Sequence, residues 1–303
     1  MSIIVIGSIN ADLAVQVNRH PKPGETLMGS GGTISPGGKG ANQAVAAALQ
    51  GASVRFVGAV GNDAYATPAL RYLTKSGVDL TGISHVDDTT GLAVIAISAD
   101  GENTIIVIPG ANARVDAEAV KQHTADIAAA DIVLLQGEIP ADGFRAAVDA
   151  AAHRVVINLA PVVPVDRDAL LQADPLMANE HEAALVLQQL GYDVTEEDSK
   201  NPEKLAADLL DAGFASVVLT LGAAGALVAT PEGSELVPPS PKVTAIDTTG
   251  AGDAFAGALV ARLDAGDSLL EAAHHAVRVA AYAVTGRGAQ DSYPTKDDQL
   301  PQV

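Results

Sequence analysis

The chain has 303 residues, contains no cysteine, and carries a formal net charge of −19 from 37 acidic and 18 basic side chains. The absence of cysteine excludes disulfides, thiolate zinc sites and cysteine nucleophiles, and the negative charge makes nucleic acid and anionic membranes unsuitable partners. No apolar run approaches the roughly 20 residues of a membrane-spanning helix, and the start MSIIVIGSINAD lacks the basic segment of a signal peptide, so we expect a cytoplasmic location.

Short apolar runs rich in β-branched residues alternate along the chain with Ala-rich segments of helical character. Such alternation is typical of a mainly parallel sheet with helices on both faces. We therefore predict an α/β fold of three layers, with the sheet between two layers of helices. The predicted strands are 2–9, 54–60, 131–136, 154–160 and 216–222, and the predicted helices are 41–50, 251–263 and 269–285.

Two regions depart from this alternation. Residues 11–35 begin with ADLAVQV and continue into a Pro- and Gly-rich stretch, and residues 91–108 pair GLAVIAIS with NTIIVI across the turn ADGE. Neither region contains a crossover helix, so we predict antiparallel strands. They would form a small sheet that projects from the main body and could act as a lid. No internal repeat or long linker is present, and we expect residues 1–303 to form a single domain.

The strongest chemical signal is DTTGAGDAFAGAL at 247–259, where small residues open a predicted helix beside a carboxylate. The N–H groups of Gly250, Ala251 and Gly252 could neutralise charge that develops on a transferred phosphoryl group. The carboxylate of Asp253 could take the proton of an attacking hydroxyl. An ordinary Gly-rich turn capped by an Asp is the alternative for this segment taken alone.

A second glycine loop, PGGKGANQ at 36–43, leads into the Ala-rich helix. Lys39 and Asn42 add polar groups suited to sugar hydroxyls, and the glycines permit close backbone approach. A Walker loop requires GxxxxGK[ST], but Gly40 and Ala41 follow Lys39 here. A dinucleotide fingerprint requires GxGxxG after the first strand, but Gly7 is followed by SINAD. Both familiar phosphate-binding loops are therefore excluded by spacing.

Together these segments resemble the ribokinase, or PfkB, family of carbohydrate and nucleoside kinases, and the resemblance extends over essentially the whole chain. It implies a ribokinase-like, Rossmann-like three-layer fold, ATP as co-substrate, and Mg²⁺ and K⁺ as ions. The segments that carry it are SINAD at 8–12, GGKGANQ at 37–43, NEHE at 179–182, TLGAAG at 220–225, DTTGAGD at 247–253 and GRGAQDS at 286–292.

The resemblance implies a set of sugar-binding residues, since a polyhydroxylated ring needs several fixed donors and acceptors. Turn capping after a strand is the alternative role for Asn10 and Asp12. The implied sugar-binding positions are Asn10, Asp12, Gly38, Lys39, Asn42, Glu138 and Asp253.

For the nucleotide, the resemblance implies that Glu182 helps to organise magnesium through water, and that the position near adenine falls on the apolar Val277. A helix-capping Asn179 with a solvated Glu182 is the alternative for the NEHE segment. The implied nucleotide-binding positions are Asn179, Glu182, Thr220, Gly222, Gly225, Gly252 and Val277.

A potassium ion is also implied, beside the glycines of DTTGAGD, where it would order the loop without entering the chemistry. A simple structural turn is the alternative. The implied potassium positions are Asp247, Thr249, Ala283, Gly286, Gly288 and Ser292.

Within the family, SINAD together with GGKGANQAVA is most like the enzymes that phosphorylate ribose, so we expect ribose as the acceptor. Another sugar or nucleoside kinase on the same scaffold is the alternative, and a non-catalytic sugar-binding protein is a third possibility. The resemblance and the apolar alternation in GLAVIAIS and NTIIVI lead us to expect a homodimer that packs through the lid sheets.

Overall fold

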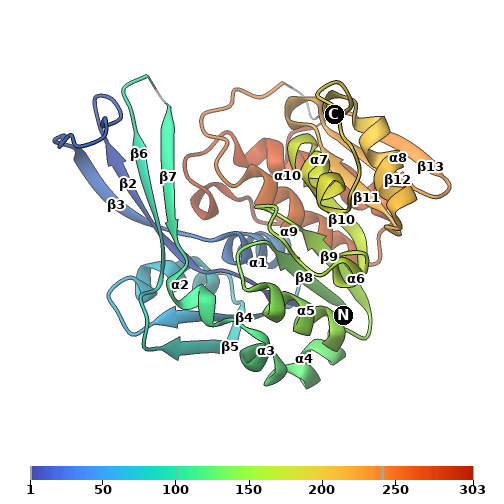
Figure 1. The fold of residues 1–303 in the computed structure, drawn as a ribbon, viewed down its shortest axis with the longest axis horizontal. Coiled ribbons are helices and arrows are strands. Elements are labelled where there is room, and N and C mark those ends of the chain that lie inside the picture. The colour runs from blue at the N-terminus through green and yellow to red at the C-terminus, as the bar shows by residue number, and fades with distance from the viewer. Residues whose placement is uncertain (1, 101, 240–241, 303) are drawn as a thin grey trace.

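The computed structural model describes residues 2–100, 102–239 and 242–302. Its main sheet has nine strands in the order β13-β12-β11-β10-β9-β8-β1-β4-β5 (Figure 1). The strands from β11 to β5 in that order pair in parallel, and β12 and β13 are antiparallel. These strands are β1 Ile3–Ile6, β4 Val54–Gly61, β5 Asp79–Val86, β8 Ile132–Gln136, β9 Arg154–Asn158, β10 Ala173–Asn179, β11 Val217–Thr220, β12 Ala226–Thr230 and β13 Gly233–Val237.

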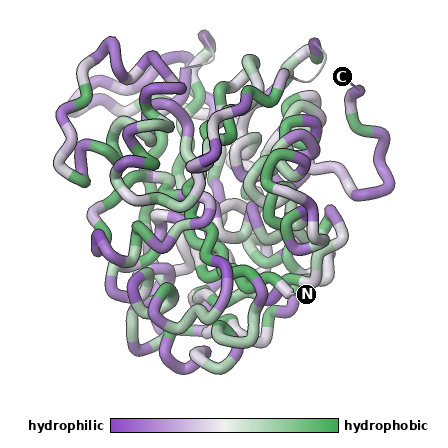
Figure 2. The backbone as a smooth tube through the Cα atoms, turned by 90° about the vertical axis from the view of Figure 1, so that its right-hand side faces the viewer, coloured by the Kyte–Doolittle hydropathy of each residue, from purple (hydrophilic) through white to green (hydrophobic). Residues whose placement is uncertain are grey.

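Helices cover both faces of the main sheet, as the alternating pattern predicts. The helices α1, α2, α9 and α10 pack on one face, and α3 to α8 pack on the other. The central strands are buried on both faces, so apolar segments gather in the interior of the main body and polar segments surround them (Figure 2). The helices are α1 Lys39–Leu49, α2 Ala66–Lys75, α3 Ala117–Lys121, α4 Thr124–Ala129, α5 Ala141–Ala150, α6 Arg167–Leu170, α7 Glu180–Gln189, α8 Pro202–Ala212, α9 Ala251–Asp264 and α10 Leu269–Ala283.

A second, four-stranded sheet projects from the body in the order β3-β2-β6-β7 (Figure 1). Its strands are β2 Asn10–Gln16, β3 Ser30–Gly37, β6 Gly91–Ile97 and β7 Asn103–Ile108. The two hairpins, β2 with β3 and β6 with β7, are antiparallel as predicted, but β2 and β6 join them as a parallel pair. The sheet is therefore mixed. The predicted turn ADGE includes residue 101, which lies outside the described residues.

The expected fold class is confirmed, since a mainly parallel sheet lies between two layers of helices with a small sheet beside it. The helices α1 and α9 approach each other very closely at Gly257, where a Cβ atom would overlap the backbone of Gln43 and lie 2.5 Å from Ala46 Cβ. This packing brings the start of α1 beside the start of α9. No helix in the described part of the chain combines the length and the apolar character needed to cross a membrane.

Candidate active site

The polar residues of SINAD lie where β1 gives way to the root of the small sheet. Asn10 opposes Gly37 in the β2–β3 pairing, and Asp12 opposes Ser35. The side chain of Asn10 is buried, and its Oδ1 accepts a hydrogen bond of 2.8 Å from Nδ2 of Asn112. Because that oxygen is engaged by Asn112, the amide N–H groups of Asn10 are the part best placed to meet a ligand.

Asp12 is an acceptor without a donor. Its Oδ1 is buried and has no hydrogen-bond partner in the described part of the chain. Burial, with further contributions from the charges of Glu138 and Asp253, raises the pKa of Asp12 to about 7. A buried carboxylate oxygen without a partner is costly, and a ligand hydroxyl would supply the missing donor.

The glycine loop fits tightly against the end of β1. Gly38 has φ of +87°, and a Cβ atom on it would lie 2.8 Å from the backbone nitrogen of Asn10. A side chain at this position would therefore be strained and would collide with the root of β2. The next N–H, that of Lys39, donates to Oε2 of Glu138 at 2.9 Å, and the hydroxyl of Ser8 donates to the same oxygen. Glu138 thus ties the loop to the end of β1.

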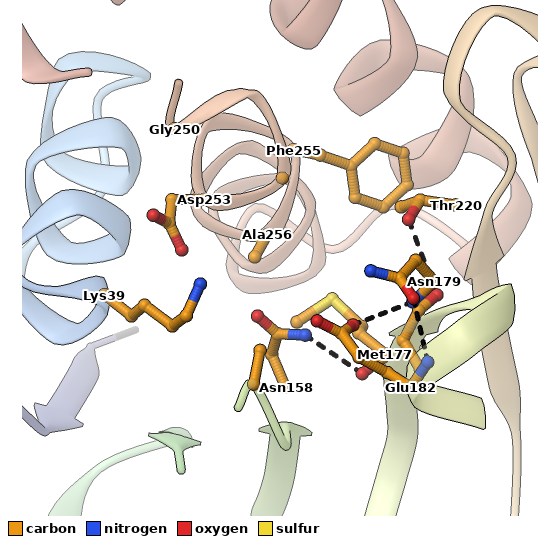
Figure 3. A pocket seen from close by; sticks show the side chains of 13 residues that line it. Lys39, Asn158, Met177, Asn179, Glu182, Thr220, Gly250, Asp253, Phe255 and Ala256 are labelled. Atoms are coloured by element: carbon orange, nitrogen blue, oxygen red, sulfur yellow. Dashed lines mark hydrogen bonds between the residues drawn. The ribbon is translucent and has the colours of Figure 1, made fainter. Parts of the chain in front are cut away.

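Lys39 and Asp253 come from different helices and point toward each other at one end of a cleft (Figure 3). The charge of Asp253 raises the pKa of Lys39 although burial opposes it, and Glu138 and Glu182 add to the effect. Lys39 is therefore a cation at neutral pH. It supplies positive charge inside a strongly acidic protein, at a place where phosphate groups could enter.

Asp253 lies in the first turn of α9, and only 6% of its surface is exposed. Gly250 caps the helix with φ of +72°, and its carbonyl accepts a hydrogen bond of 2.9 Å from the hydroxyl of Tyr293. The N–H groups of Gly252 and Asp253 have no acceptor in the described part of the chain. The N–H of Ala251 differs from our expectation, because it donates to the carbonyl of Thr248 at 3.2 Å and is not free. The helix start still offers unpaired donors to an anion.

A network of buried amides surrounds Asp253. Its Oδ2 accepts from Nδ2 of Asn42, and its Oδ1 accepts from Nε2 of Gln43, both at 2.9 Å. Gln136 donates to Oε1 of Gln43, and Gln290 donates to Oδ1 of Asn42, both at 2.8 Å. Both oxygens of the carboxylate are thus held by neutral donors and keep lone pairs for a further partner.

The far end of the cleft contains the residues expected to meet the nucleotide. Thr220, Asn179 and Glu182 line the cleft there (Figure 3), and Gly252 lines it next to Asp253 in the chain. Asn179 and Glu182 form a capping box at the start of α7, with bonds of 2.8 and 2.9 Å between each side chain and the other's backbone N–H. The helix-capping role of Asn179 is therefore present. One carboxylate oxygen of Glu182 is not used by the cap, and Figure 3 shows the side chain at the cleft.

Three other expected nucleotide positions are placed outside the lining of the cleft. Gly222 and Gly225 flank the turn between β11 and β12, with φ of +56° and +98°. A side chain on Gly225 would overlap the carbonyl of Val237, so the turn requires glycine. Val277 is buried in α10 among the core residues on the α9 and α10 face. Its surroundings are those of a packing residue.

The expected potassium positions come together from two segments. The carboxylate of Asp247 accepts from the N–H groups of Thr249 and Gly288, both at 2.9 Å. Burial opposes ionisation of Asp247, but these hydrogen bonds outweigh it and hold its pKa below the ordinary value. Asp247 therefore stays an anion and ties the DTTGAGD loop to the GRGAQDS segment.

The remaining potassium positions lie at the last residue of α10, Ala283, and in the segment after it. The N–H of Gly286 donates to the carbonyl of Ala283 at 3.1 Å, and the hydroxyl of Ser292 donates to the carbonyl of Ala289 at 2.9 Å. A Cβ atom on Gly286 would lie 2.6 Å from Cβ of Ser292, so the chain turns tightly there. The donor set is made of carboxylate, hydroxyl and carbonyl oxygens, which suits a hard cation.

A magnesium site made of side chains alone has no support. No group of three or more His, Asp or Glu residues in the described ranges is arranged to hold a metal ion. Phosphate oxygens and water would have to supply most ligands of a nucleotide-bound magnesium ion, as magnesium usually requires. Glu182 fits such a site as a partner for metal-bound water.

Several polar residues of the site were not predicted from the sequence. Some of them end or follow strands of the main sheet or lie inside the quoted motifs, and this position was the available signal. Asn112 has no such signal, because it lies in the short helix Gly110–Arg114 after β7 of the small sheet. The missed residues are Ser8, Gln43, Asn112, Gln136, Asn158 and Gln290.

Comparison with known proteins agrees with this geometry. Residues 1–296 match the model of the pfkB family of carbohydrate kinases. A ribokinase of Haemophilus influenzae is 38% identical over 303 residues, covering 99% of this chain and 97% of its own. A deoxyribokinase of Salmonella typhi is 34% identical over 300 residues, covering 97% and 96%.

A solved structure agrees as well. The structure of Arabidopsis thaliana ribokinase complexed with ribose and ATP superposes with a TM-score of 0.84 at 31% identity. The match covers 97% of this chain and 96% of the plant protein. Sequence and fold therefore point to the same group of proteins along the whole chain.

Proposed function

Because this chain belongs to the pfkB family of carbohydrate kinases, we propose that it transfers the γ-phosphoryl group of ATP to the 5-hydroxyl of D-ribose, giving ribose 5-phosphate. The observation that carries the proposal is the position of Asp253. Its carboxylate lies at the unpaired N–H groups of a helix start and faces the ammonium of Lys39. That arrangement provides a proton acceptor next to a site for phosphate.

The sugar would bind at the root of the small sheet. Asp12 has an unpaired buried oxygen to accept a sugar hydroxyl, and Asn10 presents N–H groups because Asn112 engages its oxygen. Gly38, Lys39, Asn42, Glu138 and Asp253 would complete the sugar-binding set. The similarity to a ribokinase solved with ribose and ATP supports ribose as the acceptor and ATP as the donor.

In the transfer step, Asp253 accepts the proton of the 5-hydroxyl as the hydroxyl oxygen bonds to the γ-phosphorus. The bond from that phosphorus to the bridging oxygen breaks, and ADP leaves with both electrons of the bond. Lys39 and the N–H groups at the start of α9 stabilise the charge on the phosphoryl oxygens. Magnesium bound to the phosphates would neutralise further charge, with Glu182 holding its water and Asn179 and Thr220 beside it.

We also propose that potassium binds between the DTTGAGD loop and the GRGAQDS segment. When bound, the ion would order the loop that presents the N–H groups of the anion site. The support is the pair of segments tied by Asp247 and Gly288, with the oxygens of Ser292 and the backbone nearby.

Several broader proposals follow from the same function. Residues 1–303 would act as one kinase domain in which the four-stranded sheet closes over the sugar as a lid. A second copy would pack on that lid, since β7 is an edge strand with exposed isoleucine and valine side chains. Use of ATP fits a cytoplasmic enzyme.

The second candidate function is a deoxyribokinase, which the Salmonella relative favours because it is nearly as similar as the ribokinase. The two acceptors differ in one hydroxyl group, and a site built to bond that hydroxyl discriminates strongly against a sugar that lacks it. The specificity therefore depends on whether a residue of the site bonds the 2-hydroxyl of ribose.

ADP production over a panel of acceptors tests these functions. We expect the highest kcat/KM for D-ribose in a panel with 2-deoxyribose, fructose, adenosine and pseudouridine at saturating Mg-ATP. If another acceptor is turned over as fast as ribose or faster, that acceptor would be assigned as the substrate in place of ribose. No turnover of any of them, with ribose still binding in calorimetry, would favour the non-catalytic sugar-binding alternative.

A further inference from the structure

The amide network around Asp253 has a direction. Gln290 donates to Asn42, which donates to Asp253, and Gln136 donates to Gln43, which also donates to Asp253. Asn42 and Gln43 each accept a hydrogen bond on the amide oxygen from the side away from Asp253, and each donates an N–H to Asp253. Both chains of hydrogen bonds therefore end on the carboxylate as an acceptor.

The amide of Gln43 is fixed from both ends. Its Oε1 accepts from Gln136, and its Nε2 also donates to Oδ1 of Asn158 at 2.9 Å. Asn158 is itself oriented by a bond of 3.1 Å from its Nδ2 to the carbonyl of Met177. A rotated Gln43 amide would set its oxygen against the oxygens of Asp253 and Asn158. The donating orientation is the one that these neighbours allow.

Among the described residues, the network leaves two buried amide oxygens without a hydrogen bond, so a contribution to stability alone does not explain why these amides are present. Oε1 of Gln136 and Oε1 of Gln290 are buried and lack a partner in the described part of the chain. Apolar side chains of similar size would avoid the loss of two hydrated acceptors. The end of β1 also makes room for the network, because a Cβ atom on Gly7 would overlap Oε1 of Gln136.

We propose that Gln43 is a positioning residue for the reaction, which holds the carboxylate of Asp253 as a proton acceptor facing the substrate hydroxyl. Gln136 and Asn158 keep Gln43 in its donating orientation. The proposal rests on the proposed function, because it requires Asp253 to be the base. Gln43 acts through Asp253, so its removal has a consequence only while the carboxylate is present.

A double-mutant cycle tests this dependence. Gln43→Met keeps the length of the side chain and removes its donors, and we expect kcat for ribose to fall about 10- to 100-fold, the worth of a hydrogen bond to a charged group. The KM for ATP should stay within about threefold of the unmodified enzyme. In an Asp253→Ala background the same change should lower the residual kcat no further.

The matched control is Gln50→Met at the other end of α1. Gln50 donates to the carbonyl of Pro294, away from the cleft, and its replacement should leave kcat unchanged. An equal loss from Gln43→Met in both backgrounds would overturn the proposal, because the residue would then act on the structure as a whole. If the proposed function itself were wrong, the Asp253→Ala single variant would keep normal activity, which is a separate result.

Circular dichroism of each variant checks that the chain folds. If Gln43→Met does not fold, the same cycle with Gln136→Met decides, since Gln136 bonds to Gln43 rather than to Asp253. A loss of kcat that disappears in the Asp253→Ala background supports the positioning role. An additive loss contradicts it.

Discussion

Asp253 combines three features at the scale of a single residue: burial, two neutral donors, and a cation opposite. The charge of Asp253 is the main cause that raises the pKa of Lys39, so Lys39 stays a cation opposite the carboxylate. A carboxylate held in this way can accept a proton without first moving.

Asp253→Asn keeps the shape of the side chain and removes the proton acceptor. General base catalysis contributes about 10² to 10⁴-fold in rate, so we expect kcat for ribose to fall by a factor in that range or more. ATP affinity and the thermal midpoint of unfolding should change little. Steady-state kinetics with calorimetry of ATP binding measures both. A folded variant with kcat within about threefold of the unmodified enzyme would exclude Asp253 as the base.

Asp12 gives a pH dependence with a definite sign. Burial, Glu138 and Asp253 raise the pKa of Asp12 to about 7, so the empty enzyme is protonated there below neutral pH. If the sugar donates a hydrogen bond to the ionised form, kcat/KM for ribose should rise as pH increases through about 7 and then level off. The buried surroundings that oppose ionisation of Asp12 also make the sugar hydroxyl a valuable partner.

Asp12→Asn separates this effect from other titrations in the cleft. It should raise the KM for ribose by about 10- to 100-fold, as expected for a lost hydrogen bond to a charged group, with a smaller change for ATP. It should also abolish the rise in kcat/KM for ribose near pH 7. A variant that retains both this rise and the KM for ribose of the unmodified enzyme would place Asp12 outside the sugar site.

The sequence predicted the residues of the motifs that would meet substrate and missed the residues that hold them, although Gln43 and Gln290 lie inside motifs themselves. Asp253 and Asn42 are recognisable because each stands beside glycines in a characteristic order. The partners of the network are separated along the chain by 93 positions for Gln136 and Gln43, and by 248 for Gln290 and Asn42. A hydrogen bond between such distant positions leaves no local pattern, so only the fold reveals it.

At the scale of elements, the same limit applies to the small sheet. The strands β2, β6 and β7 were predicted because β-branched and apolar residues follow one another in them. The strand β3, SGGTISPG, contains three glycines and a proline and has no intrinsic preference for a strand. Its pairing with β2 in the tertiary structure makes it a strand. The parallel pairing of β2 with β6 is likewise a long-range feature that hairpin signals do not predict.

The DTTGAGD loop, residues 247–253, leads to a prediction about potassium. Asp247 joins this loop to the segment after α10, and the loop ends at the unpaired N–H groups of α9. Exchange of potassium for sodium at constant ionic strength should lower kcat, because a loop that is less ordered presents those donors less well. Asp247→Ala should weaken the response to potassium. Equal kcat in the two salts would show that the protein orders the loop without the ion.

At the scale of the whole molecule, the edge strands of the two sheets decide where a second copy could pair. The main sheet has β13 and β5 at its edges, and the small sheet has β3 and β7. The residues Ile105 to Ile108 of β7 are 44 to 62% exposed, although all four are apolar. A free edge with apolar side chains on both of its faces is an unprotected pairing surface. The strongly acidic surface elsewhere would repel a second copy.

These properties predict a homodimer that forms through β7. We expect the protein to sediment as a dimer at micromolar concentration, and we expect Ile106→Lys to convert it to a monomer, because a lysine in the interface would have to lose its hydration. Leu236→Lys is the matched control, since Leu236 is a similarly exposed apolar residue on β13, an edge strand of the main sheet, and its replacement should leave the dimer intact. Sedimentation velocity over a range of concentrations measures the association. A monomer at every concentration, or equal dissociation by both variants, would contradict an interface at β7.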